Sequence, residues 1–166
     1  MSKVTALAIS IALLGGIWAF LALGPLAGFV LVWVGFIAWG CFFHTGGDTV
    51  ALQKTIAGMV YGAIIAGIAL ALVVNNPLGL PASVAAAIYI AITVFFLVIV
   101  ANFSLLSVVP ANVYGYAATA GYALSTETAG NYGAMDFTNP VLLVALSVVL
   151  GAVFGLVSAK VAAAIS

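Results

Sequence analysis

The sequence predicts an all-α fold: a polytopic membrane bundle of about six transmembrane helices, forming one domain over residues 1–166. Of the 166 residues, 67% are hydrophobic and 4% are charged, and the mean hydropathy is +1.42. A soluble domain carries about 25% charged residues, so this chain has too few charges for a water-facing surface. The apolar stretches are about 20 residues long and do not alternate, which is typical of membrane helices and not of barrel strands.

Composition also excludes several classes of function. Three lysines and no arginine do not make a nucleic-acid-binding surface. Two-thirds apolar residues are incompatible with a disordered chain or a soluble enzyme. The single cysteine, Cys41, excludes a disulfide framework and a multi-cysteine metal site.

Six apolar segments separated by turn-forming residues are the predicted helices. They cover Val4–Leu23, Pro25–Phe43, Lys54–Val74, Ala82–Ala101, Ser104–Leu124 and Pro140–Ala163. The first is interpreted as a retained span and not as a signal peptide, because it exceeds the usual apolar region of about 7–15 residues. Only a Gly-Pro turn separates it from the next span.

The lysines predict the orientation. With six spans, Lys3, Lys54 and Lys160 fall on one membrane face, while Glu127 and Asp136 fall on the other. Because positive residues favour the cytoplasmic side, both termini are expected there, in a bacterial inner membrane.

The two halves of the chain, residues 1–81 and 82–166, show related features. The third and sixth segments carry Gly58-x-x-x-Gly62 and Gly151-x-x-x-Gly155, a spacing that lets helix backbones approach closely. Pro25 and Pro110 each begin or interrupt a glycine-containing span. Three helices per half would place the halves in opposite orientations, the inverted repeat of many transporters. Such matches also arise in any chain rich in glycine and alanine, and this alternative stays open.

The fifth segment is the most polar of the six. Asn112, Tyr116 and Thr119 follow helical spacing and lie on one face, with Tyr114 nearby as an aromatic wall. The neighbouring face is smooth and suits helix packing; it consists of Ala111, Gly115 and Ala118. The polar face is either a solute pathway or a polar seam buried against another helix.

Pro110 is expected to break this segment near mid-membrane. Proline lacks a backbone donor, so the carbonyl near Leu106 should lose its helical partner and face solvent or a polar side chain. Non-helical backbone at that depth is tolerated only where it is buried in protein or lines a wet cavity.

The remaining candidate residues give weaker signals. His44, the only histidine, has Thr45 and the carboxylate of Asp48 nearby, but there is no nucleophile and there are fewer than three metal ligands, so no enzyme, metal or cofactor is expected. His44 is interpreted as interfacial or, alternatively, as pathway-lining. Trp39 and Phe42-Phe43 are expected in the interfacial aromatic belt, and Trp18 either there or on a pore wall.

Two functions compete. The first is a channel or facilitator for passive permeation of a small neutral polar solute, with urea-like amides as the best match and water, ammonia or small alcohols as competitors. The second is a structural or accessory membrane protein. No charged residue lies in the middle of a predicted span, so a bare ion would find no counter-ion there. The expected partners are the lipid bilayer, a small polar solute and further copies of the chain, in a trimer or another small ring.

The chain resembles a family of short bacterial inner-membrane proteins known only by a domain-of-unknown-function label. Four stretches carry the resemblance: Gly16-Ile17-Trp18, Phe43-His44-Thr45-Gly46-Gly47, Leu106-Ser107-Val108-Val109-Pro110 running on to Gly115 and Ala118-Thr119, and Leu150-Gly151-Ala152-Val153-Phe154-Gly155. The resemblance covers most of the chain and implies an inner-membrane location and this fold, without an activity. The position of His44 also carries proline in that pattern, so no family-wide role follows for the histidine.

Overall fold

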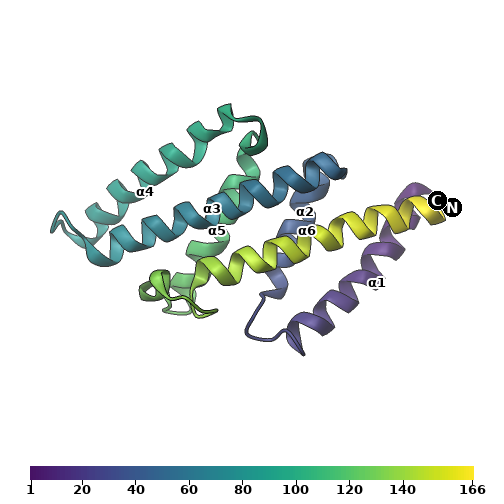
Figure 1. Cartoon of the computed structure of the whole chain (residues 1–166), viewed down its shortest axis with the longest axis horizontal. Coiled ribbons are helices and arrows are strands. Elements are labelled where there is room, and N and C mark those ends of the chain that lie inside the picture. The colour runs from purple at the N-terminus through teal and green to yellow at the C-terminus, as the bar shows by residue number, and fades with distance from the viewer.

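The computed structural model describes residues 1–166 and contains six α-helices and no β-strand (Figure 1). The predicted all-α bundle of six helices is confirmed. The helices are α1 (Lys3–Leu23), α2 (Val32–His44), α3 (Thr49–Asn75), α4 (Ala82–Ile99), α5 (Val109–Ser125) and α6 (Pro140–Ile165). Three short 3₁₀ helices accompany them: η1 (Val100–Asn102), η2 (Ser104–Leu106) and η3 (Ala129–Gly133).

Local sequence signals place most helix ends. The side chains of Ser2, Asp48 and Asn139 each accept a backbone N–H in the first turn of α1, α3 and α6. These bonds satisfy donors that the helix itself leaves unpaired. Asn76 ends α3 in a left-handed conformation with φ of 41°, which asparagine tolerates better than most residues.

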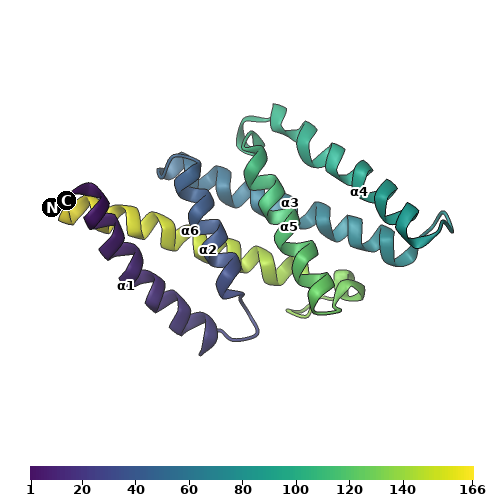
Figure 2. The same ribbon diagram turned by 180° about the vertical axis from the view of Figure 1, so that it is seen from behind.

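The long helices α3 and α6 form the centre of the bundle. Short helix α5 packs on α3, and short helix α2 packs on α6 (Figures 1 and 2). The outer helix α4 lies beside α3, and α1 lies beside α6. The first three helices therefore make the same set of contacts as the last three.

This correspondence extends to individual positions. Ala6, Ser10 and Trp18 are buried in α1, and Ala85, Tyr89 and Leu97 are buried at the same spacing in α4. Threonine ends both short helices. The hydroxyl of Thr45 donates to the carbonyl of Cys41 at 2.8 Å, and that of Thr126 donates to the carbonyl of Tyr122 at 2.7 Å.

Three predicted helix starts are wrong. The second helix begins at Val32 and not at Pro25, because residues 24–31 form an irregular segment in which Gly28 has φ of +85°. The third begins at Thr49, five residues earlier than expected, because Asp48 caps it. The fifth begins at Val109 and not at Ser104.

The helices fall into two groups by length. Four helices are long and apolar enough to cross a membrane, namely α1, α3, α4 extended to Asn102, and α6, so the chain is a membrane protein. At 1.5 Å per residue, the 13 residues of α2 span only about 20 Å, less than a hydrocarbon core of about 30 Å. The irregular segments before α2 and α5 must therefore supply part of any crossing.

Two of the three tryptophans, Trp18 and Trp39, lie in the core, whereas Trp33 is exposed. Trp18 is 0% exposed and Trp39 is 2% exposed, and Phe42 is also fully buried. The indole Nε1–H of Trp18 donates to the carbonyl of Val32 at 2.9 Å, and that of Trp39 donates to Ser158 Oγ at 2.9 Å. The expectation of a belt position is therefore wrong for Trp18 and Trp39, because each indole N–H finds its partner inside the bundle.

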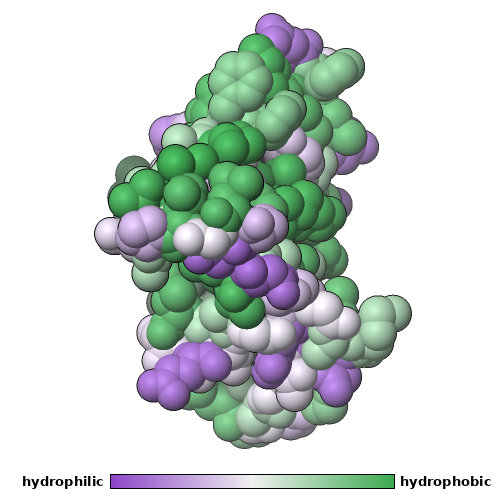
Figure 3. Space-filling model, turned by 90° about the vertical axis from the view of Figure 1, so that its left-hand side faces the viewer, coloured by the Kyte–Doolittle hydropathy of each residue, from purple (hydrophilic) through white to green (hydrophobic).

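Both termini lie side by side at one end of the molecule, and the turn between α3 and α4 lies at the other (Figure 1). Seen from the side of that turn, hydrophobic residues dominate the upper part of the surface and polar residues gather over the lower part (Figure 3). An even number of crossings accounts for adjacent termini.

Adjacent termini predict one labelling pattern. In a Cys41→Ser background, single cysteines at Ser2 and Ser166 should react with a membrane-impermeant maleimide from the same side, which the positive-inside rule predicts to be the cytoplasmic one. A cysteine at Glu127 should react from the opposite side. Labelling of all three from one face of intact cells would contradict this topology.

Candidate functional site

The segment between α4 and α5 is not a continuous helix. After α4 the chain makes the short turns η1 and η2, and α5 then begins at Val109 with Pro110 in its first turn. Pro110 therefore begins a helix and does not break one, in contrast to the prediction. A first-turn position suits proline, because its missing N–H would have no helical partner there.

Asn112 holds this interruption together. Its side chain is fully buried, and Nδ2–H₂ donates to the carbonyls of Leu97 at 3.2 Å and Leu106 at 3.1 Å. The predicted loss of a helical partner at Leu106 is confirmed, and the polar side chain that replaces the partner is Asn112. One amide thus joins the end of α4, the turn η2 and the first turns of α5.

The other side-chain atom of Asn112 has no hydrogen-bond partner. Oδ1 is buried, and a Cβ added at Gly58 of α3 would lie 2.7 Å from it. Exchange of oxygen and nitrogen would place Oδ1 against two carbonyl oxygens, so the orientation of the amide is set by its neighbours. A buried acceptor without a donor is uncommon and marks this amide as a candidate binding group.

Thr119 is buried within the bundle, whereas Tyr116 reaches α4. Thr119 is fully buried, and its hydroxyl donates to the carbonyl of Gly115 in the same helix at 2.9 Å. The hydroxyl of Tyr116 lies 3.2 Å from Thr93 Oγ1 of α4. Only Tyr116 reaches a cavity.

The proton positions at Tyr116 follow from Thr93. The single hydroxyl proton of Thr93 is directed to the carbonyls of Tyr89 at 2.9 Å and Ile90 at 3.1 Å, which can only accept. Thr93 Oγ1 therefore accepts from Tyr116. The oxygen of Tyr116 keeps its own lone pairs free, so it can accept one more hydrogen bond.

A crevice of about 160 Å³ lies between α3, α4 and α5, and we call it the α4 crevice. Ala66 and Leu70 of α3, Ile90 of α4, and Tyr116 and Ala120 of α5 line it, and no charged residue does. The ring of Tyr116 forms part of its wall, one helical turn beyond Asn112.

The other predicted pathway residues lie elsewhere. Tyr114 is on the outer face of α5 and 38% exposed. Trp18 belongs to the core between α1, α2 and α6, and His44 is exposed at the end of α2. Of the predicted pathway residues, only Tyr116 lines the α4 crevice, while Asn112 and Thr119 are buried within the bundle on the same helix.

The start of α2 has a similar arrangement that the sequence analysis missed. The backbone N–H of Leu31 donates to Ser147 Oγ of α6 at 2.8 Å, and Trp18 binds the carbonyl of Val32. Ser147 is fully buried. A serine in the middle of an apolar helix was the available signal, because such a hydroxyl needs a partner in lipid.

Comparison with known proteins identifies a family. The model of a family described as "Protein of unknown function (DUF1097)" matches residues 8–163. The chain belongs to the DUF1097 family. The resemblance noted in the sequence is thereby confirmed. No curated protein and no solved structure matches the chain.

The chemistry open to this DUF1097 protein is neutral hydrogen bonding. Lys3 lies in the first turn of α1, Lys54 in the second turn of α3 and Lys160 in the second-last turn of α6, and Glu127 and Asp136 lie in the segment between α5 and α6. The Nζ of Lys54 donates a hydrogen bond to Ser107 Oγ at 3.2 Å, close to the start of α5. The groups inside the bundle are amides, hydroxyls, indoles and backbone carbonyls, which can exchange hydrogen bonds with a neutral solute.

Proposed function

We propose that this DUF1097 protein is an inner-membrane facilitator for passive passage of a small neutral polar solute. The path follows α5 from the α4 crevice beside Tyr116 to Asn112 and the non-helical turns before α5. The unpartnered Oδ1 of Asn112, buried beside the Leu106 carbonyl that Pro110 leaves without a helical donor, is the observation that carries the proposal.

The acceptor oxygens that lack a donor favour a solute that donates hydrogen bonds. Asn112 Oδ1 has no donor, and the oxygen of Tyr116 keeps free lone pairs because its proton goes to Thr93. A solute rich in N–H or O–H groups would satisfy both acceptors in turn. Urea and small amides fit best, because they carry several donors and a flat face that can slide along the ring of Tyr116.

The arrangement of helices supports transport. Irregular backbone leads into both short helices, α2 and α5, and transporters build their sites where helices of inverted repeats are interrupted in this way. The matching contacts of the two halves support an inverted repeat with its halves at residues 1–81 and 82–166. Absence of charge from the middle of the spans favours uncoupled flow, because proton-coupled carriers place ionisable groups in the membrane. The assembly is proposed to be a homo-oligomer, since a single small bundle offers little room for a pore.

Flux into proteoliposomes tests the proposal. Urea, formamide, glycerol and water should enter faster than into empty liposomes, without a proton or sodium gradient. Tyr116→Phe removes one hydroxyl from the path and should lower urea flux about fivefold, the equivalent of roughly 1 kcal/mol. Tyr114→Phe removes a hydroxyl from the outer face of the same helix and should leave flux unchanged. Saturable uptake that requires an ion gradient would overturn the passive mechanism.

A structural or accessory membrane protein is the second candidate. Complete burial of Asn112 favours it, because its side-chain amide then serves to join α4 and η2 to α5. Flux no greater than in empty liposomes for every solute tested would favour this function over transport.

A further inference from the structure

A second crevice lies at the end of the molecule where the termini meet, and we call it the α1 crevice. It has a volume of about 320 Å³ and runs between α1 and α6, with Phe43 of α2 beside it. Leu7, Ala159 and Ala162 form its apolar floor, and Lys3 and Ser166 stand at its rim. Because it contains the first turn of α1 and the last turns of α6, it opens at a membrane interface.

The α1 crevice is the counterpart of the α4 crevice. Each lies between an outer helix and a long central helix, beside the last residues of a short helix: Phe43 of α2 in one and Leu124 of α5 in the other. Ala159 and Ala162 of α6 have the same spacing as Ala66 and Ala69 of α3. The two differ in charge, since the α4 crevice is lined only by apolar and aromatic residues whereas the α1 crevice carries Lys3.

Lys3 is available to bind an anion. It is exposed and forms no ion pair or side-chain hydrogen bond, unlike Lys54, which bonds to Ser107. A lysine stem can lie along apolar surface while its ammonium stays at the interface. Basic residues beside crevices between membrane helices attract acidic lipid headgroups.

We propose that the α1 crevice binds one anionic phospholipid of the surrounding bilayer. One acyl chain lies on Leu7, Ala159 and Ala162, and the headgroup phosphate pairs with the ammonium of Lys3. The combination of an apolar floor and a single unpaired cation at its rim matches an anionic lipid and not a zwitterionic one. This inference requires only that the protein is embedded in a membrane, so it holds for either proposed function.

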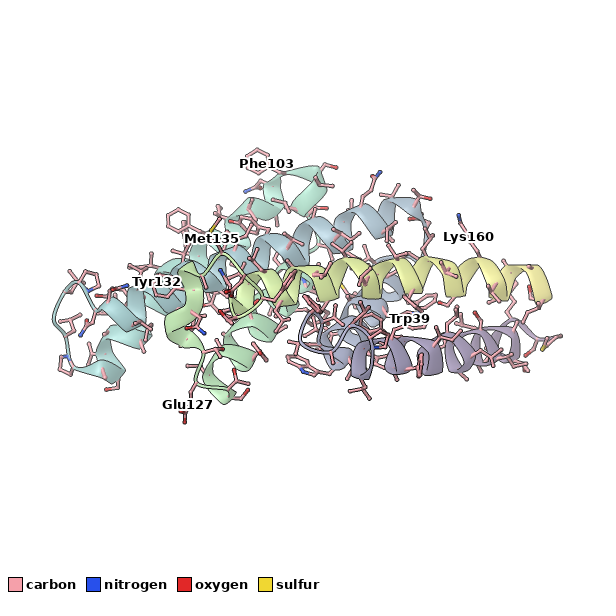
Figure 4. The ribbon with its side chains drawn as sticks, turned by 60° about the horizontal axis from the view of Figure 1, so that its bottom comes forward. Trp39, Phe103, Glu127, Tyr132, Met135 and Lys160 are labelled. Carbon is pink, nitrogen blue, oxygen red and sulfur yellow. The ribbon has the colours of Figure 1, made fainter.

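Two pairs of matched variants test the site by native mass spectrometry in neutral detergent. The probes are dioleoyl phosphatidylglycerol and dioleoyl phosphatidylcholine, supplied singly and in competition. Lys3→Gln and Lys160→Gln remove the same charge at the same end of the molecule, but Lys160 points away from α1 on the outer side of α6 (Figure 4). Ala162→Leu narrows the α1 crevice, and Ala69→Leu makes the same change at the corresponding position of α3.

The wild-type protein should retain one phosphatidylglycerol with about fivefold preference over phosphatidylcholine, the effect of one lysine at a membrane surface. Lys3→Gln should lose the preference and Lys160→Gln should keep it. Ala162→Leu should lose the bound lipid, whereas Ala69→Leu should retain it. Equal effects of the two lysine variants, or no preference in the wild type, would overturn the site. Because both lysines are exposed, the lysine pair decides the question even if an alanine variant fails to fold.

Discussion

Gly115→Ala should strongly destabilise the protein, whereas Gly121→Ala, less than two turns further along the same helix, should be tolerated. A Cβ at Gly115 would overlap the backbone of Met59, because α5 and α3 touch backbone to backbone there. A Cβ at Gly121 would meet nothing within 4 Å. Over-packing of this kind costs about 1–3 kcal/mol and sometimes more, while alanine in an open helical position is slightly stabilising.

Thermal denaturation in mild detergent, followed by circular dichroism and by size-exclusion chromatography, measures the difference. Gly151→Ala is the corresponding change in the other half, since its Cβ would overlap the backbone of Gly35. We expect this variant, like Gly115→Ala, to lower the melting temperature. Equal melting temperatures for Gly115→Ala and Gly121→Ala would contradict the close contact of α3 and α5.

Asn112→Leu should loosen the connection between α4 and α5. The leucine side chain branches at the same atom, although its methyl groups are bulkier, and it cannot donate, so the carbonyls of Leu97 and Leu106 lose their shared partner. Each hydrogen bond between membrane helices contributes about 0.6–1.7 kcal/mol, so the loss should total about 1–3 kcal/mol. Faster hydrogen exchange at the backbone amides of residues 97–109 should accompany it.

Thr119→Val is the matched control for that variant. Thr119 is as deeply buried as Asn112, but its hydroxyl only donates to a carbonyl of its own helix, which already belongs to the helical ladder. The change should alter stability by less than 1 kcal/mol, as is usual for a bond that has a backbone alternative. Equal destabilisation by both variants would show that burial, and not the bridge to α4 and η2, makes Asn112 important.

The sequence analysis succeeded wherever a feature depends on nearby residues. Composition and apolar segment lengths predicted six helices, because each helix satisfies its own backbone hydrogen bonds in a membrane. Gly58-x-x-x-Gly62 and Gly151-x-x-x-Gly155 predicted close helix approach, and both pairs contact the facing short helix. The missing N–H of Pro110 predicted that the carbonyl of Leu106 would need another donor.

Other features were decided by partners distant in the sequence. The start of α2 depends on a bond between Leu31 and Ser147, which are 116 residues apart, so local signals at Pro25 pointed to the wrong residue. Trp39 has an apolar body and one N–H, which suits an interface as well as a core. Ser158 on α6 supplies the partner that allows its burial.

The sequence by itself therefore determined the class of protein, the number of helices and the glycines of close contact, because hydropathy, proline chemistry and residue volume act over a few residues. Tertiary structure alone decided which helices pair, where the short helices begin, and what Asn112 binds. The physical reason is that a buried polar group must find a partner, and in this fold the partners of Asn112, Leu31 and Trp39 lie on other helices or turns.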